Sequence, residues 1–406
     1  MSSTRQKLLI STIHSLYPIS HGGIVRVIEE SKFLAKNSFD VHLIGDKTKK
    51  IDLEKVEKIT GAKAYTFSNI THLTIGTINR LGSFTLGWIY NPLIKHDIEK
   101  LAETIRPDII QSEFIHTAYH VSKISKKFDI PFVLSEHNVE SIRLSGVGKG
   151  SRKRLKSIER KICNLADCVT TVSENDKQEL DKIGVDRPIR VVPNGVDYDR
   201  YQIRNEDRER IRERNGIRKD DTVLIFHGTL VYRPNVTANK LLKEYIFPKV
   251  NKKYKNSKLL LIGPGHFQNS SKNIIELSEI AYNDFPVHLS MGDVGVVPII
   301  AGSGTRLKII EYLASGIPTV STEAGAEGLP VRDGEHIIIA KDAKDDFIDK
   351  TIKLLNDKQL RERLSENGKE LVKEKLDWDI VLKEYIRIYR EIRGCGIDQI
   401  SSFEIA

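Results

Sequence analysis

A glycine-rich loop in the second half of the chain leads into a helix that begins with basic residues. The loop includes Gly302 and Gly304, and the residues that follow include Thr305, Arg306 and Lys308. Free backbone N–H groups and the helix dipole favour an anion at such a helix start, and arginine and lysine add positive charge. The pattern therefore predicts a site for phosphate groups.

A carboxylate follows on the same face of this helix. Glu311 lies three residues after Lys308, and residues three apart are neighbours on a helix surface. We expect Glu311 to accept the hydroxyl groups of a ribose while Lys308 neutralises a diphosphate. A surface ion pair worth about 0.2–0.5 kcal/mol is the plainer interpretation, but the preceding glycine loop and the Gly-Ile-Pro sequence at 316–318 favour a ligand site.

The elements that must position these residues alternate regularly along the chain. Two consecutive series of apolar segments alternating with amphipathic stretches predict two doubly wound, Rossmann-like α/β domains facing each other across a cleft. We place the domains at 1–205 and 206–375, with a final helix at 376–395 packing back on the first. The apolar segments that we expect to be parallel strands lie at 7–13, 41–45, 108–111, 132–136, 168–172, 189–192, 222–227, 258–262, 294–298, 319–321 and 337–339.

The first turn of this arrangement also contains a candidate binding sequence. Gly22 and Gly23 follow the first predicted strand and begin a helix. Paired glycines there let a phosphate or a sugar approach the backbone N–H groups. A tight turn accounts for the same pair equally well.

Composition narrows the class of protein. The 406 residues include 39% hydrophobic and 29% charged residues, enough for two cores. No apolar run approaches the ~20 residues that span a bilayer, and the three cysteines form no disulfide or metal pattern, so we expect a cytoplasmic protein. The net charge of +9 indicates an anionic partner, and without a nucleic-acid-binding motif we do not expect nucleic acid.

Taken together, the motifs resemble those of retaining GT-B glycosyltransferases of family 4, also called group 1. The segment 302–329, closed by Asp333-Gly334, is similar to the family's donor-binding region. Shorter motifs follow in the family's order, and the resemblance covers about residues 7 to 390. The sequence departs from the family's common pattern at two places. Ser303 replaces the first glutamate of the common Glu-x7-Glu pair, and Arg233 alone represents the usual Arg/Lys pair. The shorter motifs are His21-Gly-Gly, Glu136-His-Asn, Pro193-Asn-Gly-Val-Asp, Phe226-His-Gly, Pro234-Asn and Ile262-Gly-Pro-Gly.

The resemblance implies roles for individual residues. Gly22 and Gly23 would face the diphosphate or the transferred sugar, Lys308 and Arg306 would hold the phosphates, and Glu311 would bind the ribose. His137 would approach the transferred sugar, although a structural histidine capping a loop remains an open alternative. The predicted catalytic residues are His137, Lys308 and Glu311, and the predicted donor-binding residues are Gly22, Gly23, Gly228, Arg233, Gly304, Thr305, Arg306 and Leu307.

The implied reaction is transfer of a sugar from a UDP- or GDP-linked donor with retention of anomeric configuration. Donors of hydrogen bonds around the departing diphosphate stabilise the developing charge without a protein nucleophile. We therefore expect front-face attack, with no metal and no cofactor besides the nucleotide-sugar co-substrate. Asp197-Tyr-Asp199 has the form of a metal-binding Asp-x-Asp motif, but it follows a predicted turn, so we expect no metal there.

The acceptor is much harder to infer. We expect the N-terminal domain to bind a glycan, lipid-linked or small-molecule acceptor. A basic run at 150–161 and an apolar stretch at 75–94 are compatible with peripheral docking on the inner membrane face. We favour a solvated basic helix face and a buried helix instead. Two other functions stay open: a nucleotide-sugar 2-epimerase of similar fold, and a non-catalytic protein that binds sugar nucleotides. A dehydrogenase is disfavoured because no GxGxxG follows a strand.

Overall fold

The computed structural model divides the chain into two compact units. The first comprises Met1–Pro193 with Leu382–Ala406, and the second comprises Asn194–Val381. From the sequence we predicted the division at 205/206 and the return of the chain at 376. Gly304 and most of the apolar stretch 75–94 lie outside the described residues. The structure describes residues 5–19, 21–47, 52–68, 91–143, 149–230, 232–265, 271–278, 280–302 and 305–394.

The first unit contains a seven-stranded sheet in which every neighbouring pair is parallel. Its strand order is β3-β2-β1-β4-β5-β6-β7. Register follows the apolar pattern, since Leu8 of β1 pairs with Val41 on one side and Ile109 on the other. The strands are β1 (Gln6–Ser15), β2 (Phe39–Asp46), β3 (Lys63–Thr66), β4 (Ile109–Glu113), β5 (Phe132–Glu136), β6 (Cys168–Thr171) and β7 (Ile189–Val191).

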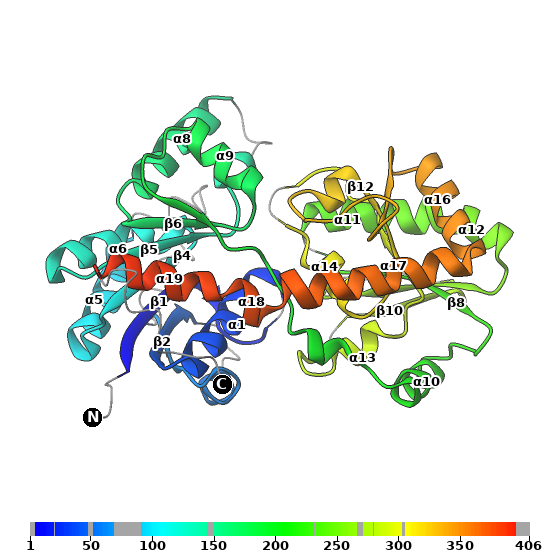
Figure 1. Ribbon diagram of the computed structural model, residues 1–406, viewed down its shortest axis with the longest axis horizontal. Helices are drawn as coiled ribbons and strands as arrows, with labels where there is room; N and C mark the ends of the chain where they lie inside the picture. Colours follow the sequence, from blue (N-terminus) through cyan, green and yellow to red (C-terminus); the bar gives the residue numbers. More distant parts are fainter. Residues whose placement is uncertain are drawn as a thin grey trace. The chain divides into compact units, whose positions relative to one another are not determined.

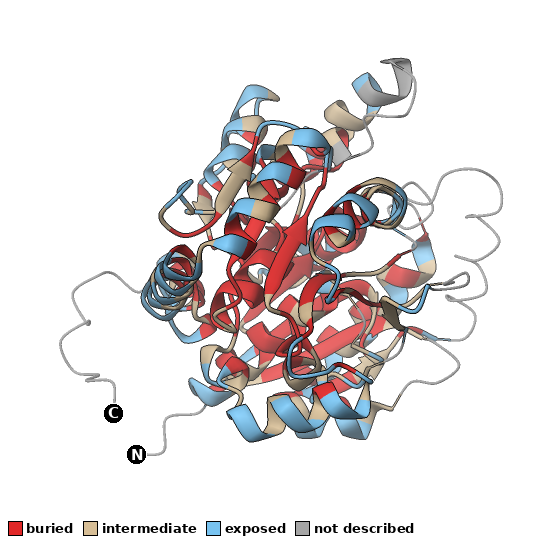
Figure 2. Cartoon of the chain, turned by 90° about the vertical axis from the view of Figure 1, so that its right-hand side faces the viewer, coloured by how far each residue is buried: buried red, intermediate tan, exposed pale blue. Residues whose placement is uncertain are grey.

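Helices pack against this sheet and expose their polar faces (Figures 1 and 2). The basic run of the sequence analysis forms part of α8, in which Lys153 and Arg154 are exposed whereas Ile162 and Cys163 are buried. Tyr389 of the last helix, drawn in red in Figure 1, donates to Gln111 of β4. The helices are α1 (Gly22–Lys36), α2 (Leu53–Thr60), α5 (Pro92–Ile105), α6 (Ile115–Phe128), α7 (Glu140–Arg143), α8 (Lys149–Cys163), α9 (Glu174–Lys182) and α19 (Lys383–Ile392).

The second unit repeats the topology with six parallel strands in the order β10-β9-β8-β11-β12-β13. Its central strands read as continuous apolar runs because helices cover both faces, and Val223, Leu224, Ile225 and Phe226 are all fully buried. The strands are β8 (Thr222–His227), β9 (Ser257–Ile262), β10 (Ile274–Leu277), β11 (Val294–Val297), β12 (Thr319–Thr322) and β13 (Ile338–Ala340).

The helices of the second unit include a long C-terminal series. The final helix that we predicted over 376–395 is interrupted between Val381 and Lys383, and Ile380 is 38% exposed. Among the described residues, no helix combines the length and apolar character needed to cross a bilayer. The helical segments are η1 (Tyr198–Tyr201), α10 (Asn205–Arg214), α11 (Arg233–Leu241), η2 (Leu242–Ile246), α12 (Phe247–Lys253), α13 (Phe285–Leu289), α14 (Leu307–Ala314), α15 (Glu323–Ala326), α16 (Asp345–Asn356), α17 (Lys358–Leu371), η3 (Val372–Leu376) and α18 (Trp378–Val381).

This topology defines where ligands bind in each unit. The chain direction across the sheet reverses between β1 and β4 in the first unit and between β8 and β11 in the second. Open parallel sheets bind ligands outside the carboxyl ends of the strands at such a switch point. The turns after these four strands are therefore the places to examine.

Candidate functional site

The carboxyl end of β8 and the start of α14 enclose the ammonium group of Lys308. Nζ of Lys308 donates to Oδ1 of Asn235 at 2.8 Å and lies 4.0 Å from the centroid of the Phe226 ring. Only 7% of Lys308 is exposed. A cation at this helix start is what the sequence predicted, and its partner from α11 is Asn235.

Burial makes the charge of Lys308 costly. The pKa of Lys308 lies well below its ordinary value because burial penalises the ammonium form and the nearby Arg306 repels it, while Glu311 opposes the shift. Arg306, the residue before α14, is also buried. Two buried cations thus lie close to one carboxylate, an arrangement that added negative charge would stabilise.

Glu311 is held by two side chains that lie far away in the sequence. Its Oε1 accepts a hydrogen bond from the Tyr201 hydroxyl at 2.9 Å, and its Oε2 lies 3.2 Å from Nε2 of His227. Burial alone would raise the pKa of Glu311, but His227 and Tyr201 outweigh it and the pKa is lowered. The carboxylate is therefore ionised and fixed in orientation.

Glycine is required at the end of β8. Gly228 has a φ of 140°, a conformation that side chains with a Cβ rarely adopt. A Cβ at this position would lie 2.8 Å from Nδ2 of Asn235 and 3.1 Å from Nζ of Lys308. Gly228 thus leaves the space in which the Lys308–Asn235 pair sits.

The other predicted residues of the second unit lie nearby with different exposure. The Thr305 hydroxyl accepts a hydrogen bond from Asn194 at 2.6 Å, and Leu307 is the first residue of α14. Arg233 is exposed at the start of α11, two residues before the buried Asn235. Gly304 is not among the described residues.

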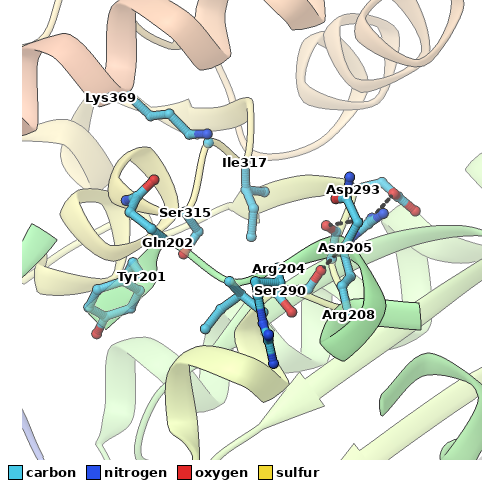
Figure 3. A pocket seen from close by; sticks show the side chains of 13 residues that line it. Tyr201, Gln202, Arg204, Asn205, Arg208, Ser290, Asp293, Ser315, Ile317 and Lys369 are labelled. Carbon is cyan, nitrogen blue, oxygen red and sulfur yellow. Dashed lines mark hydrogen bonds and ion pairs between the residues drawn. The ribbon is translucent and has the colours of Figure 1, made fainter. Parts of the chain in front are cut away.

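A separate hollow lies at the other end of α14. It has a volume of about 430 Å³ and is lined by residues that include Tyr201, Arg208, Asp293, Ser315 and Lys369. Figure 3 shows Tyr201 on one side of this hollow and Arg208 with Asp293 on the other. Arg208 is paired with Asp293 at 2.5 Å and Arg204 with Asp207 at 3.0 Å, so two of the cationic side chains that line the hollow already have carboxylate partners. We therefore keep Lys308, and not this hollow, as the candidate phosphate site.

In the first unit, aromatic rings gather where β1, β4 and β5 end. The ring of Phe114 lies 4.0 Å from that of His137 and 4.8 Å from that of His14, centroid to centroid. His21 packs on His14 at 4.4 Å, and burial together with the neighbouring His137 lowers the pKa of His21 to about 4. A Cβ at Gly23 would lie 3.1 Å from the Phe114 ring. The structure therefore brings His137 and the glycine pair Gly22-Gly23 to the same cluster.

A buried polar network lies behind His137. Nε2 of His137 is 2.5 Å from Oε2 of Glu113, and the Gln111 amide group donates to Glu113 and to Glu30. The Tyr389 hydroxyl donates to the Gln111 carbonyl oxygen at 2.6 Å. His137 thus has a buried carboxylate partner, which fixes the orientation of its ring.

Some of the residues that contact the predicted site residues were not themselves predicted. The structure also shows the surroundings of Asp197 and of the cysteines. Glu113 and Tyr201 were not predicted, and His227 was noted only as part of the Phe226-His-Gly motif, without a role. His227 ends a predicted strand and Glu113 lies two residues beyond one, which was the available signal. The Asp197 side chain caps η1 by accepting from the backbone N–H of Arg200, in keeping with the expected turn. Cys163 and Cys168, which show no disulfide pattern in the sequence, are free thiols, and both are buried.

Two doubly wound domains, with a buried cation at the start of α14 in the second, define a GT-B glycosyltransferase. The profile described as Glycosyltransferase Family 4 matches residues 20–200, and that described as Glycosyl transferases group 1 matches residues 221–357. The chain therefore belongs to the group 1, family 4 glycosyltransferases and is a sugar-transferring enzyme.

Individual relatives agree with this assignment. An uncharacterized glycosyltransferase, MJ1607 from Methanocaldococcus jannaschii, is 23% identical over 379 residues, covering 88% of this chain and 91% of that protein. Sucrose-phosphate synthase from Thermosynechococcus elongatus has a TM-score of 0.77 at 15% identity, covering 97% of this chain and 100% of that structure. Anabaena HepE, solved with UDP and glucose, has a TM-score of 0.75 at 14% identity, covering 95% and 100%.

Proposed function

We propose that this enzyme transfers a sugar from a UDP- or GDP-linked donor to a saccharide, lipid-linked or small-molecule acceptor, with retention and without a metal. The observation that carries this proposal is the buried Lys308 ammonium at the start of α14, beside Arg306. The presence of UDP in the structurally similar HepE supports a nucleotide donor.

The chemistry requires stabilisation of a departing diphosphate. Breaking the anomeric C–O bond leaves negative charge on the diphosphate and positive charge on the sugar ring. Lys308 and Arg306 would neutralise the diphosphate, and Gly228 would let it approach the backbone at the end of β8. Glu311, held by Tyr201 and His227, would accept the ribose hydroxyls. Groups fixed in this way need no reorganisation during the reaction.

Retention by front-face attack is consistent with the carboxylates near the histidine cluster. A double displacement needs a carboxylate next to the anomeric carbon. Glu113 is the carboxylate closest to His137, but it is 0% exposed and fully engaged with His137 and Gln111. It lies behind His137 and does not reach a substrate, so the acceptor would attack from the face that the diphosphate leaves.

Calorimetric titration of UDP, GDP and ADP tests the donor site. We expect one nucleotide to bind the wild type equally well with EDTA and with Mg²⁺. Replacing Lys308 by Met keeps the length of the side chain and removes its charge, so we expect affinity to fall by about 10- to 100-fold, the worth of a hydrogen bond to a charged group. Lys240→Met is the control, because Lys240 is 71% exposed on α11 and its replacement should leave affinity unchanged. Failure of all three nucleotides to bind at millimolar concentration would remove the basis for the donor site.

Product analysis separates transfer from the two alternatives. With the matching nucleotide-sugar, transfer consumes donor only when an acceptor is present, and NMR should show the same anomeric configuration in donor and product. Turnover of donor to an epimer and free nucleotide without any acceptor would indicate the 2-epimerase. Binding without any turnover over a broad acceptor panel would indicate the non-catalytic protein.

A further inference from the structure

The helix α8 carries most of the net charge of the protein. Its 15 residues, Lys149–Cys163, include seven basic residues and one acidic residue, Glu159. The helix thus contributes a net charge of +6 to the +9 of the whole chain. Such a concentration of one sign of charge on a single helix indicates an anionic partner.

The cations of α8 lack acidic partners within the protein. Lys153, Arg154, Arg160 and Lys161 are exposed, and Lys156 is half-buried. In the part of the chain that the structure describes, none of these five side chains is paired with a carboxylate. From the sequence we favoured a solvated face for this run, but a solvated helix commonly carries acidic residues three or four positions from its basic ones. The structure therefore favours the other interpretation, a surface that binds an external anion.

The helix α10 shows the usual arrangement. It is also rich in arginine, and Arg204 pairs with Asp207 at 3.0 Å. Arg208 and Arg212 both pair with Asp293, at 2.5 Å and 3.1 Å. The arginines of α10 therefore find their carboxylates inside the protein, whereas the cations of α8 do not.

The exposed face of α8 is basic without being apolar. Ile162 is buried, Leu155 and Ile158 are half-buried, and no large apolar side chain is exposed among the described residues of the helix. The cations extend from Lys153 to Lys161, a distance of about 12 Å along the helix axis. The helix lies on the outside of the first unit (Figure 1). A row of cations on an outer helix face fits a surface that presents many negative charges better than it fits a single phosphate group.

We propose that the five cations of α8 form a docking surface for a membrane rich in anionic lipids. Clusters of four to eight lysine and arginine residues on one helix are attracted by the negative potential of anionic headgroups. Because no large apolar side chain accompanies these cations, the attraction is electrostatic and requires no insertion into the hydrocarbon layer.

Glu159 connects this surface with the turn after β5. The carboxylate is fully buried and accepts hydrogen bonds from the backbone N–H groups of Glu140, at 2.6 Å, and Ser141, at 3.2 Å. These two residues begin α7, directly after the Glu136-His-Asn motif. Docking through α8 would hold this segment near the lipid headgroups. That placement favours the lipid-linked class of acceptor, a consequence that rests on the proposed function.

Cosedimentation of the full chain with vesicles tests the docking. Vesicles of phosphatidylcholine alone are compared with vesicles made of equal parts of phosphatidylcholine and phosphatidylglycerol. We expect binding to the mixed vesicles only. Raising the salt concentration from about 0.1 M to about 1 M shortens the screening length from about 10 Å to about 3 Å, so it should release the protein.

A triple substitution on α8 tests which residues bind. We expect Lys153→Gln, Arg154→Gln and Lys161→Gln together to weaken binding about 100-fold, because each basic residue near such a surface strengthens binding about fivefold.

The matched control removes the same charge from exposed lysines of the second unit, at the end of α12. It combines Lys252→Gln, Lys253→Gln and Lys255→Gln, and vesicle binding should stay close to that of the wild type. Unchanged circular dichroism and nucleotide affinity in both triple variants would show that they fold.

Several results would overturn the proposal. They are a wild type that does not sediment with the mixed vesicles, equal binding to phosphatidylcholine alone, an α8 variant that binds like the wild type, and an equal loss in both triple variants. Retention on heparin without vesicle binding would identify a soluble polyanion as the partner instead. Failure of the proposed function is distinguishable, because it appears as lack of nucleotide binding in the wild type and leaves vesicle binding intact.

Discussion

Phe114 has a backbone conformation that is nearly restricted to glycine. Its φ is 70° and its ψ is 156°, a region in which a residue with a Cβ carries about 1–3 kcal/mol of strain. Two hydrogen bonds hold the peptide in place: the Phe114 N–H donates to the Ser135 carbonyl at 2.8 Å, and the Phe114 carbonyl accepts from the Ser112 hydroxyl at 3.0 Å. We infer that the strain is retained because it places the ring between His14 and His137.

Comparing Phe114→Ala with Phe114→Gly isolates this strain. Both variants lose the same buried ring, at a cost of about 3–5 kcal/mol relative to the wild type. At an unstrained position glycine is less stable than alanine by about 0.5–1 kcal/mol. Here glycine also relieves the strain of about 1–3 kcal/mol, so we expect Phe114→Gly to be the more stable of the two by roughly 1 kcal/mol.

Urea denaturation followed by circular dichroism measures the difference between the two variants. Ala118→Gly in α6 is the control, because Ala118 lies within a regular helix. Since its methyl group is also fully buried, glycine there should be less stable than the wild type by at least about 1 kcal/mol. Both Phe114 variants should lose activity, since neither supports the His137 ring. The reasoning is refuted if Phe114→Ala is as stable as Phe114→Gly or more stable, or if either variant keeps the wild-type kcat.

Three further predictions concern ligand binding and pH. Burial lowers the pKa of Lys308, and the side chain is neutral above that pKa. A bound diphosphate favours the charged form, so nucleotide binding should take up a proton and weaken as pH rises. Calorimetry in two buffers of different ionisation enthalpy measures the proton uptake, which Lys308→Met should abolish. Gly228→Ala should weaken nucleotide binding by at least tenfold, since the new Cβ displaces Lys308 and Asn235; retained affinity in the same titration would contradict this. The folded-state pKa of His21 is about 4, against an ordinary 6.5. As the pH is lowered from 6.5 to 4, His21 is protonated in the unfolded chain before it is protonated in the folded protein, so the free energy of unfolding falls. His21→Gln should show a smaller fall in urea midpoint over that range than the wild type.

The sequence allowed prediction of most strands because parallel strands are continuous apolar runs. All eleven predicted segments correspond to strands, whereas β3 and β10 were not predicted. Both are edge strands of only four residues, and none of their side chains except Ala64 is buried. Each apolar run is short and interrupted by polar residues, Lys63 and Thr66 in β3 and Glu276 in β10.

The residues of the candidate site that lie close together in the sequence could be predicted, whereas their partners far away in the sequence could not. Arg306, Lys308 and Glu311 lie within six residues of one another, and helical periodicity places them together. The partners of Glu311 and Lys308 are 73 to 110 positions away, and no local pattern indicates such a pairing. The strain at Phe114 could not be predicted either, because phenylalanine rarely adopts a positive φ.

The two units differ in the charge of the side chains at their candidate sites. In the second unit, Lys308 and Arg306 are both buried, and burial together with the charge of Arg306 lowers the pKa of Lys308 although Glu311 opposes the shift. In the first unit, the hydrogen bond to His137 and the charges of His137 and Arg26 outweigh burial and lower the pKa of Glu113, whereas burial favours the neutral form of His137. The buried basic pair Lys308 and Arg306 suits a diphosphate that gains negative charge as it leaves. A neutral hydrogen-bonding ring, that of His137, suits a sugar that becomes positive. Placing a cationic His137 next to such a sugar would oppose the reaction, so the burial that keeps His137 neutral is itself a requirement of the proposed chemistry.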